Sequence, residues 1–69
     1  MSYWKHIGKM VKDHREQNKF TQEKLGKLIG SSKQFVSNFE NGRKKCSVDK
    51  LVQISSALDC YLDITLTPK

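Results

Sequence analysis

Hydrophobic residues in the first part of the chain repeat at the spacing of a helix. Ile7 and Val11 are four residues apart, and Trp4 is in phase with them. Arg15 continues the same spacing, although it is charged. Side chains three and four residues apart lie on one face of a helix, so the pattern predicts a helix over residues 3–18.

A second helix is predicted over residues 22–29. Thr21 is suited to cap its N-terminus, and Gly30 is suited to the left-handed conformation that often follows a helix C-terminus. The apolar side chains expected on its inner face are Leu25, Leu28 and Ile29.

The third predicted helix lies in the stretch "SSKQFVSNFENG", residues 31–42, and it is polar along one whole side. Phe35, Val36 and Phe39 fall on the apolar side. The polar side carries Lys33, Gln34, Ser37, Asn38 and Asn41. At 100° per residue these five fall within an arc of about 140°. A solvent-facing helix usually mixes Lys with Glu, yet this side has no acidic residue.

A fourth helix is predicted after the basic loop "RKK". Ser47 caps its N-terminus, and Asp49 in the first turn suits the positive end of the helix dipole. The inner stripe expected for this helix consists of Val48, Leu51, Ile54 and Leu58. The chain therefore contains four predicted helices before the character of the sequence changes.

The tail "CYLDITLTPK" alternates apolar and polar residues, which is typical of a strand with one apolar face. Leu62, Ile64 and Leu66 would form that face. One strand cannot satisfy its own backbone groups, so we expect it to pair with the same strand of a second copy. The alternative is a frayed tail in which the alternation has no structural meaning.

Positive charge is concentrated in the part of the chain that holds the polar-sided helix. Residues 1–45 contain eleven Lys and Arg against four Asp and Glu, a net charge of +7, whereas residues 46–69 contain two against three, a net charge of −1. A polyanion is the natural partner of such a surface, and a solubilising lysine-rich surface is the alternative.

Length and cysteine usage narrow the class of protein. The 69 residues form one small domain at most, so association with a second copy is the expected source of added stability. The N-terminus has no apolar signal segment, and no stretch is long enough to span a membrane. Cys46 and Cys60 are therefore expected to be free thiols in a reducing cytosol.

The second and third predicted helices, joined by a glycine turn, form a helix-turn-helix pattern. The second helix of this motif lies in the DNA major groove, where Gln and Asn bind adenine, Lys binds guanine and Ser contacts several bases. An acidic residue would repel phosphate, which explains the acid-free side. The stretches "TQEKLGKLIG", "VSNFENGR" and "SVDKLVQISSALD" resemble the Cro/CI–XRE family of bacterial and phage DNA-binding proteins, over roughly residues 7–62.

This resemblance implies a mainly α fold, a lambda-repressor-like bundle of four helices with the C-terminal strand paired across a dimer. Residues 1–60 would be the helix-turn-helix DNA-binding domain, and residues 61–69 the strand and tail. The base-reading residues it implies are Ser32, Lys33, Gln34, Ser37 and Asn38. The phosphate-binding residues are Gln22, Asn41, Gly42, Arg43 and Lys44, partly through backbone amides. Arg15 and Glu40 match a pair that forms an ion bridge between the first and third helices.

Several residues depart from the family pattern or have two open interpretations. Gly26 stands where the family usually has alanine, and since both are small the helix crossing is expected to survive. Phe35 either fills core space or contacts a thymine methyl beside the DNA. Trp4 is either a lid on the core or, with Tyr3, a stacking platform for bases. Lys5, Lys9 and Lys12 on the first helix either contact phosphate or form a solvated face.

Catalysis, metals and cofactors are not expected. His6 and His14 have no further ligand at suitable spacing, and Cys46 and Cys60 lack the Cys-x-x-Cys spacing of a zinc site. The two serines of "SSKQ" have no histidine base nearby and are better explained as helix caps.

The expected function is a dimeric repressor that binds palindromic double-stranded operator DNA. The tail and "SNFENG" are similar to HipB-type antitoxins, which implies a HipA-like kinase toxin as a partner. Restriction–modification controllers, phage-type repressors and a protein-sequestering module with residual DNA binding are the alternatives. The expected location is the cytoplasm, at the bacterial nucleoid, with no membrane partner.

Overall fold

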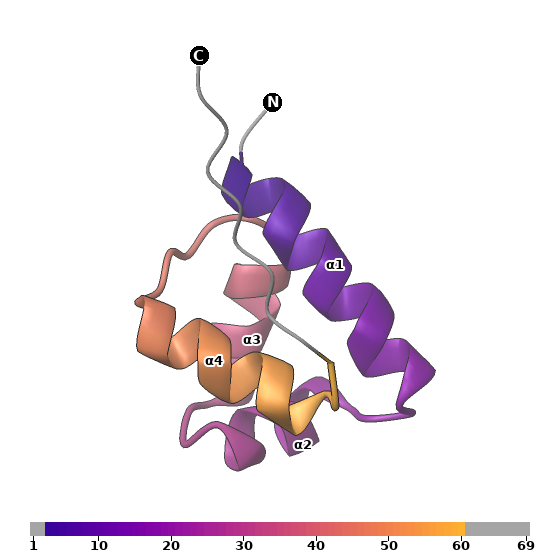
Figure 1. Cartoon of the computed structure of the whole chain (residues 1–69). Helices are drawn as coiled ribbons and strands as arrows, with labels where there is room; N and C mark the ends of the chain where they lie inside the picture. The colour runs from indigo at the N-terminus through magenta and orange to yellow at the C-terminus, as the bar shows by residue number, and fades with distance from the viewer. Residues whose placement is uncertain (1–2, 61–69) are drawn as a thin grey trace.

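The computed structural model describes residues 3–60, and four helices account for most of them (Figure 1). They are α1 (Tyr3–Gln17), α2 (Gln22–Leu28), α3 (Lys33–Glu40) and α4 (Val48–Ala57). No strand occurs in this part of the chain, which confirms the predicted helical fold. The longest helix has 15 residues, and none within residues 3–60 is both long and apolar enough to cross a membrane. The predicted strand, with Leu62, Ile64 and Leu66, lies outside the described residues.

Three of the helices begin at a hydroxyl side chain. The side-chain oxygens of Thr21, Ser32 and Ser47 accept hydrogen bonds of 3.0, 3.1 and 3.2 Å from the backbone N–H three residues later. Each hydroxyl satisfies one of the backbone donors that a helix N-terminus leaves without a partner. The predicted starts of the second and fourth helices are confirmed, and the serine pair caps α3 through its second member.

All four helices end in the same way, with one residue in the left-handed conformation. These residues are Lys19, Gly30, Gly42 and Asp59, with φ of 60°, 65°, 76° and 54°. At each end, two backbone N–H groups turn back to bond carbonyl oxygens of the last turn, which is the Schellman arrangement. The two glycines were predicted to end their helices, but a lysine and an aspartate in this role were not foreseen.

The core forms where the apolar sides of the helices meet. Its buried members are Leu25, Ile29, Val36, Phe39, Leu51, Ile54 and Leu58. Phe39 is at its centre, with Trp4 edge-on at a ring distance of 6.1 Å and Phe35 stacked at 5.9 Å. Both of these rings are half-buried against the core. The structure therefore supports the core interpretation for Trp4 and for Phe35.

Two residues predicted on inner faces are instead exposed. Leu28 is 47% exposed and Val48 is 60% exposed. Leu28 is about 60° around its helix from Leu25 and about 100° from Ile29. Val48 is about 60° from Leu51 and about 120° from Ile54, so both lie at the edge of the buried stripe. Short helices bury a narrow stripe, so apolar residues at its edge stay in contact with solvent.

Glycines allow α3 to lie very close to two other helices. A Cβ atom on Gly8 of α1 would lie 2.3 Å from the carbonyl oxygen of Phe39, and one on Gly26 of α2 would lie 2.8 Å from the carbonyl carbon of Ser32. The expected crossing of α2 and α3 at Gly26 is present, and it is closer than a side chain would allow without a shift, because the atoms that a Cβ would meet belong to backbone.

Replacement of Gly8 by alanine tests this close contact. Alanine favours a helix over glycine by about 1 kcal/mol, but overpacking against a backbone costs about 1–3 kcal/mol. We expect Gly8→Ala to lower the free energy of unfolding by about 1–2 kcal/mol in urea titrations followed by circular dichroism. Lys9→Ala, at the neighbouring exposed position, is the control and should keep or raise the stability. Equal stability of the two variants would contradict the close contact.

Candidate nucleic-acid interface

The residues predicted to read bases lie along the exposed side of α3. Ser32 caps the helix and is exposed, as are Lys33 and Gln34, whereas Ser37 and Asn38 are half-buried. The opposite side of the helix is buried in the core through Val36 and Phe39. Because one side of an eight-residue helix is fixed by packing, the polar side is held in a defined direction.

Two of these side chains are bonded to each other. The amide Nε2 of Gln34 donates to the Oδ1 of Asn38, one helical turn later, at 3.3 Å. Residues four apart on a helix are neighbours, so the two amides form a pair on the polar side. Such pairing restricts the rotamers of both side chains before any ligand binds.

An ion pair buried between α1 and α3 lies beneath this surface. The Nε of Arg15 donates to Oε2 of Glu40 at 2.6 Å, and Nη2 donates to Oε1 at 3.2 Å. A third donor, Nη1, reaches the carbonyl oxygen of Phe20 at 2.7 Å. Only 9% of Arg15 and 6% of Glu40 is exposed. The hydrogen bond that Arg15 donates to Glu40 raises the pKa of the guanidinium, although burial acts in the opposite direction.

Gln22, the first residue of α2, is attached to the same ion pair. Its Nε2 donates to Oε1 of Glu40 at 3.1 Å, so this oxygen accepts from both Gln22 and Arg15. The resemblance implied that this glutamine bonds phosphate and supports the recognition helix. The bond to Glu40 at the end of α3 supports that helix through a partner that the sequence pattern did not name, and the phosphate contact stays a prediction.

The loop after α3 uses its backbone amides internally. The N–H groups of Asn41, Gly42 and Arg43 all donate to carbonyl oxygens of α3, and the side-chain amide of Asn41 donates to one of them at 2.9 Å. In this conformation these three N–H groups already have acceptors, and phosphate binding by the loop stays a prediction. The exposed side chains of Arg43 and Lys44 are the groups that remain for that role.

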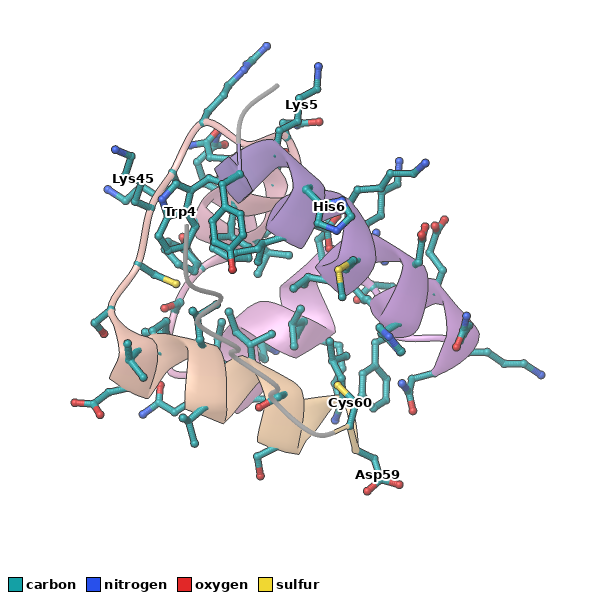
Figure 2. All side chains as sticks on the ribbon, turned by 45° about the horizontal axis from the view of Figure 1, so that its top comes forward. Trp4, Lys5, His6, Lys45, Asp59 and Cys60 are labelled. Atoms are coloured by element: carbon teal, nitrogen blue, oxygen red, sulfur yellow. The ribbon has the colours of Figure 1, made fainter. Side chains whose placement is uncertain are left out.

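The N-terminal turn of α1 lies beside this loop, which the sequence analysis did not foresee. A Cβ on Gly42 would lie 2.8 Å from the Cα of Lys5. Figure 2 shows Lys5, Trp4 and Lys45 at the same end of the molecule. No signal in the hydrophobic pattern places these two segments together, because they are almost 40 residues apart in the chain.

Residues 3–60 contain no cluster of side chains that could hold a metal ion. No three His, Cys, Asp or Glu side chains in that range come together as a possible metal site. Cys46 and Cys60 are free thiols, and burial raises the pKa of Cys46 against the opposing charge of Lys50.

The sequence matches known proteins along most of its length. A helix-turn-helix family model, HTH_3, matches residues 11–64. The chain is 30% identical over 60 residues to the ImmF control region 10 kDa protein of Bacillus phage phi105, covering 87% of this chain and 67% of that protein. It is 36% identical over 53 residues to the uncharacterized HTH-type transcriptional regulator y4wC of Sinorhizobium fredii, covering 77% of this chain and 37% of that protein. The chain thus spans between about a third and two thirds of the length of these relatives.

Solved structures share the same fold. The restriction–modification controller protein C.AhdI from Aeromonas hydrophila superposes with a TM-score of 0.80 at 24% identity, covering 84% of each chain. At that identity the likeness shows the fold alone. A chain of the HipA-HipB-O2-O3 complex superposes with a TM-score of 0.76 at 26% identity, covering 99% of this chain and 96% of the other.

The buried ion pair generates a stability prediction. Glu40→Ala leaves Arg15 buried without its partner, a change that typically costs about 3–5 kcal/mol, which is about the whole stability expected for so small a domain. We therefore expect this variant to be largely unfolded at 25 °C by circular dichroism. The double variant Arg15→Met, Glu40→Leu removes both charges and should recover most of the folded signal. A single variant that melts like the unaltered protein would show that the pair does not stabilise the fold.

Proposed function

Because the chain belongs to the helix-turn-helix family of the Cro/CI–XRE type, we propose that it is a sequence-specific DNA-binding transcription regulator. The observation that carries this proposal is the acid-free polar side of α3, held outward by a helix whose other side is buried. The fold and the relatives are those of transcription regulators rather than of enzymes.

In this proposal α3 enters the major groove and its polar side chains read bases. Gln34 and Asn38 are suited to adenine, whose N6 and N7 offer a donor and an acceptor, and Lys33 is suited to O6 and N7 of guanine. Ser32 and Ser37 contribute hydroxyl groups that can donate or accept. The bond between the two amides supports reading by a rigid pair rather than by independent side chains.

Phosphate contacts on both sides of α3 would fix its orientation on the duplex. Gln22 at the start of α2 keeps one N–H of its amide after bonding Glu40, because the amide carries two. Arg43 and Lys44 are exposed at the other end of α3. Contacts of this kind supply affinity and register but carry no base information themselves.

The proposed active form is a homodimer on a palindromic operator. Two copies of α3 would enter successive major grooves on one DNA face, about 34 Å apart or a multiple of one helical turn. The alternating tail is the proposed contact between copies, through Leu62, Ile64 and Leu66. Occupation of a promoter in this way would repress transcription.

Similar solved structures support two specific roles for a transcription regulator of this family. The match to a chain of the HipA-HipB-O2-O3 complex supports an antitoxin of the HipB type, with a HipA-like kinase toxin as partner. The fold of C.AhdI supports a controller protein of a restriction–modification system. A protein-sequestering module with residual DNA binding is the candidate from a different functional class.

Selection from random duplex DNA at near-physiological salt tests the proposed function. We expect enrichment of a palindrome with half-sites one helical turn, or a multiple of it, apart.

Gln34→Ala should cost about 1–3 kcal/mol of discrimination at particular bases. Arg43→Ala, the matched control, should weaken binding to all sequences alike and make the salt dependence less steep by about 0.9. Uniform, salt-sensitive binding without enrichment would contradict base reading and favour the protein-sequestering alternative.

Removal of residues 61–69 tests the proposed dimer. We expect the shortened protein to sediment as a monomer and to bind a palindromic site much more weakly, because each half-site contact would then form independently. Its circular dichroism spectrum should keep the helical signal, since the core lies within residues 3–60. A shortened protein that stays dimeric would refute the contact through the tail.

A further inference from the structure

Lysines form a row along one side of α1. Lys5, Lys9 and Lys12 are spaced by four and three residues, which places them on one face of the helix, and all three are exposed. The labelled Lys5 in Figure 2 projects from the end of the molecule that also holds Lys45. The row therefore begins at the loop proposed to bind phosphate.

Contacts fix how this part of α1 lies against α3. A Cβ on Gly8 would lie 2.3 Å from the carbonyl oxygen of Phe39 and 2.8 Å from that of Glu40. A Cβ on Gly42 would lie 2.8 Å from the Cα of Lys5. Lys5 and Gly8 of α1 are thus close to Gly42 and to the C-terminal end of α3, respectively.

The order of residues around α1 places the row on the outer side of this contact. Val11 faces the core, and Gly8, about 60° farther around the helix, faces the end of α3. Lys12 and Lys5 come about 40° and 60° beyond Gly8, and Lys9 about 100° beyond it. The row therefore lies on the side of α1 away from the core, beyond the contact with the end of α3.

The basic residues of the loop after α3 continue the row of lysines. Arg43, Lys44 and Lys45 are exposed at the start of the row. Among residues 3–60, neither Lys9 nor Lys12 lies within ion-pair distance of a carboxylate. Glu16 lies beyond Lys12 at the far end of the same face, so the basic surface ends there.

We propose that Lys9 and Lys12 bind phosphates of the DNA backbone beside the bases read by α3. This inference rests on the proposed function, since it concerns the same DNA complex. It adds α1 to the interface as a contact that carries no base information and increases affinity for every sequence. A backbone phosphate is the chemical partner because it is the anion that lies on both sides of a major groove occupied by α3.

The test measures binding as a function of salt. Affinity for the selected operator duplex and for an unrelated duplex is followed by fluorescence anisotropy over a series of KCl concentrations. We expect Lys9→Ala and Lys12→Ala each to make the slope of log K against log[KCl] less steep by about 0.9, with unchanged base preference. Lys12→Arg should retain the slope of the unaltered protein.

Lys24→Ala is the matched control, because it removes the same charge from a different helix. Gly26 of α2 contacts the start of α3, and Lys24 lies about 160° around α2 from Gly26, on the side away from this contact. Its slope should not change. The inference would be overturned if Lys9→Ala and Lys12→Ala had the same slope as the unaltered protein. It would also be overturned if Lys24→Ala changed the slope as much as they did. Circular dichroism establishes that the variants are folded, as lysine-to-alanine changes favour helix.

Failure of the proposed function gives a different result. If the unaltered protein has no base preference, sequence-specific regulation is wrong. The slopes measured on the unrelated duplex still decide whether Lys9 and Lys12 bind phosphate.

Discussion

A buried ion pair between Arg15 and Glu40 joins the segments that form the proposed DNA-binding surface. Charges removed from water are costly unless their partners and hydrogen bonds are complete. Here Arg15 donates to both carboxylate oxygens and to the carbonyl of Phe20, and Gln22 supplies a further donor to Glu40. No buried side-chain nitrogen or oxygen among residues 3–60 lacks a partner. Together these bonds constrain how α1, α2 and α3 lie relative to one another.

The glycine contacts, like the ion pair, fix the position of α3 against the other helices. Gly8 brings α1 against the end of α3, and Gly26 brings α2 against its start. α3 is therefore held at both ends and along its buried side by Val36 and Phe39. Rigid support of a reading helix reduces the entropy lost on binding, because few side chains and no backbone segments of the helix need to be ordered.

This arrangement explains how so short a chain can offer an extended surface to a DNA duplex. α3 itself has only eight residues, so its polar side covers a few base pairs at most. The groups proposed to bind phosphate around it come from separate segments: Gln22 on α2, Arg43 in the loop and, as inferred, Lys9 on α1. The buried pair, with Gln22 bonded to it, joins the three helices, and additional reach would come from the proposed second copy.

The sequence by itself determined the features that depend on near neighbours in the chain. Hydroxyl caps such as Ser47, a glycine that ends a helix such as Gly42, and the acid-free side of α3 follow from the spacing of residues within one helix. Family resemblance identified Arg15 and Glu40 as partners, which the spacing within single helices could not do.

Only the tertiary structure decided the features that depend on distances between segments. It showed that Gln22 bonds Glu40, that the amides around Gly42 are used within the helix end, and that Lys5 lies beside this loop. It also showed Leu28 at the edge of the buried stripe rather than within it. Helical periodicity gives the direction of a side chain around its own axis, whereas the angle at which two helices cross is set by the packing of all of them at once.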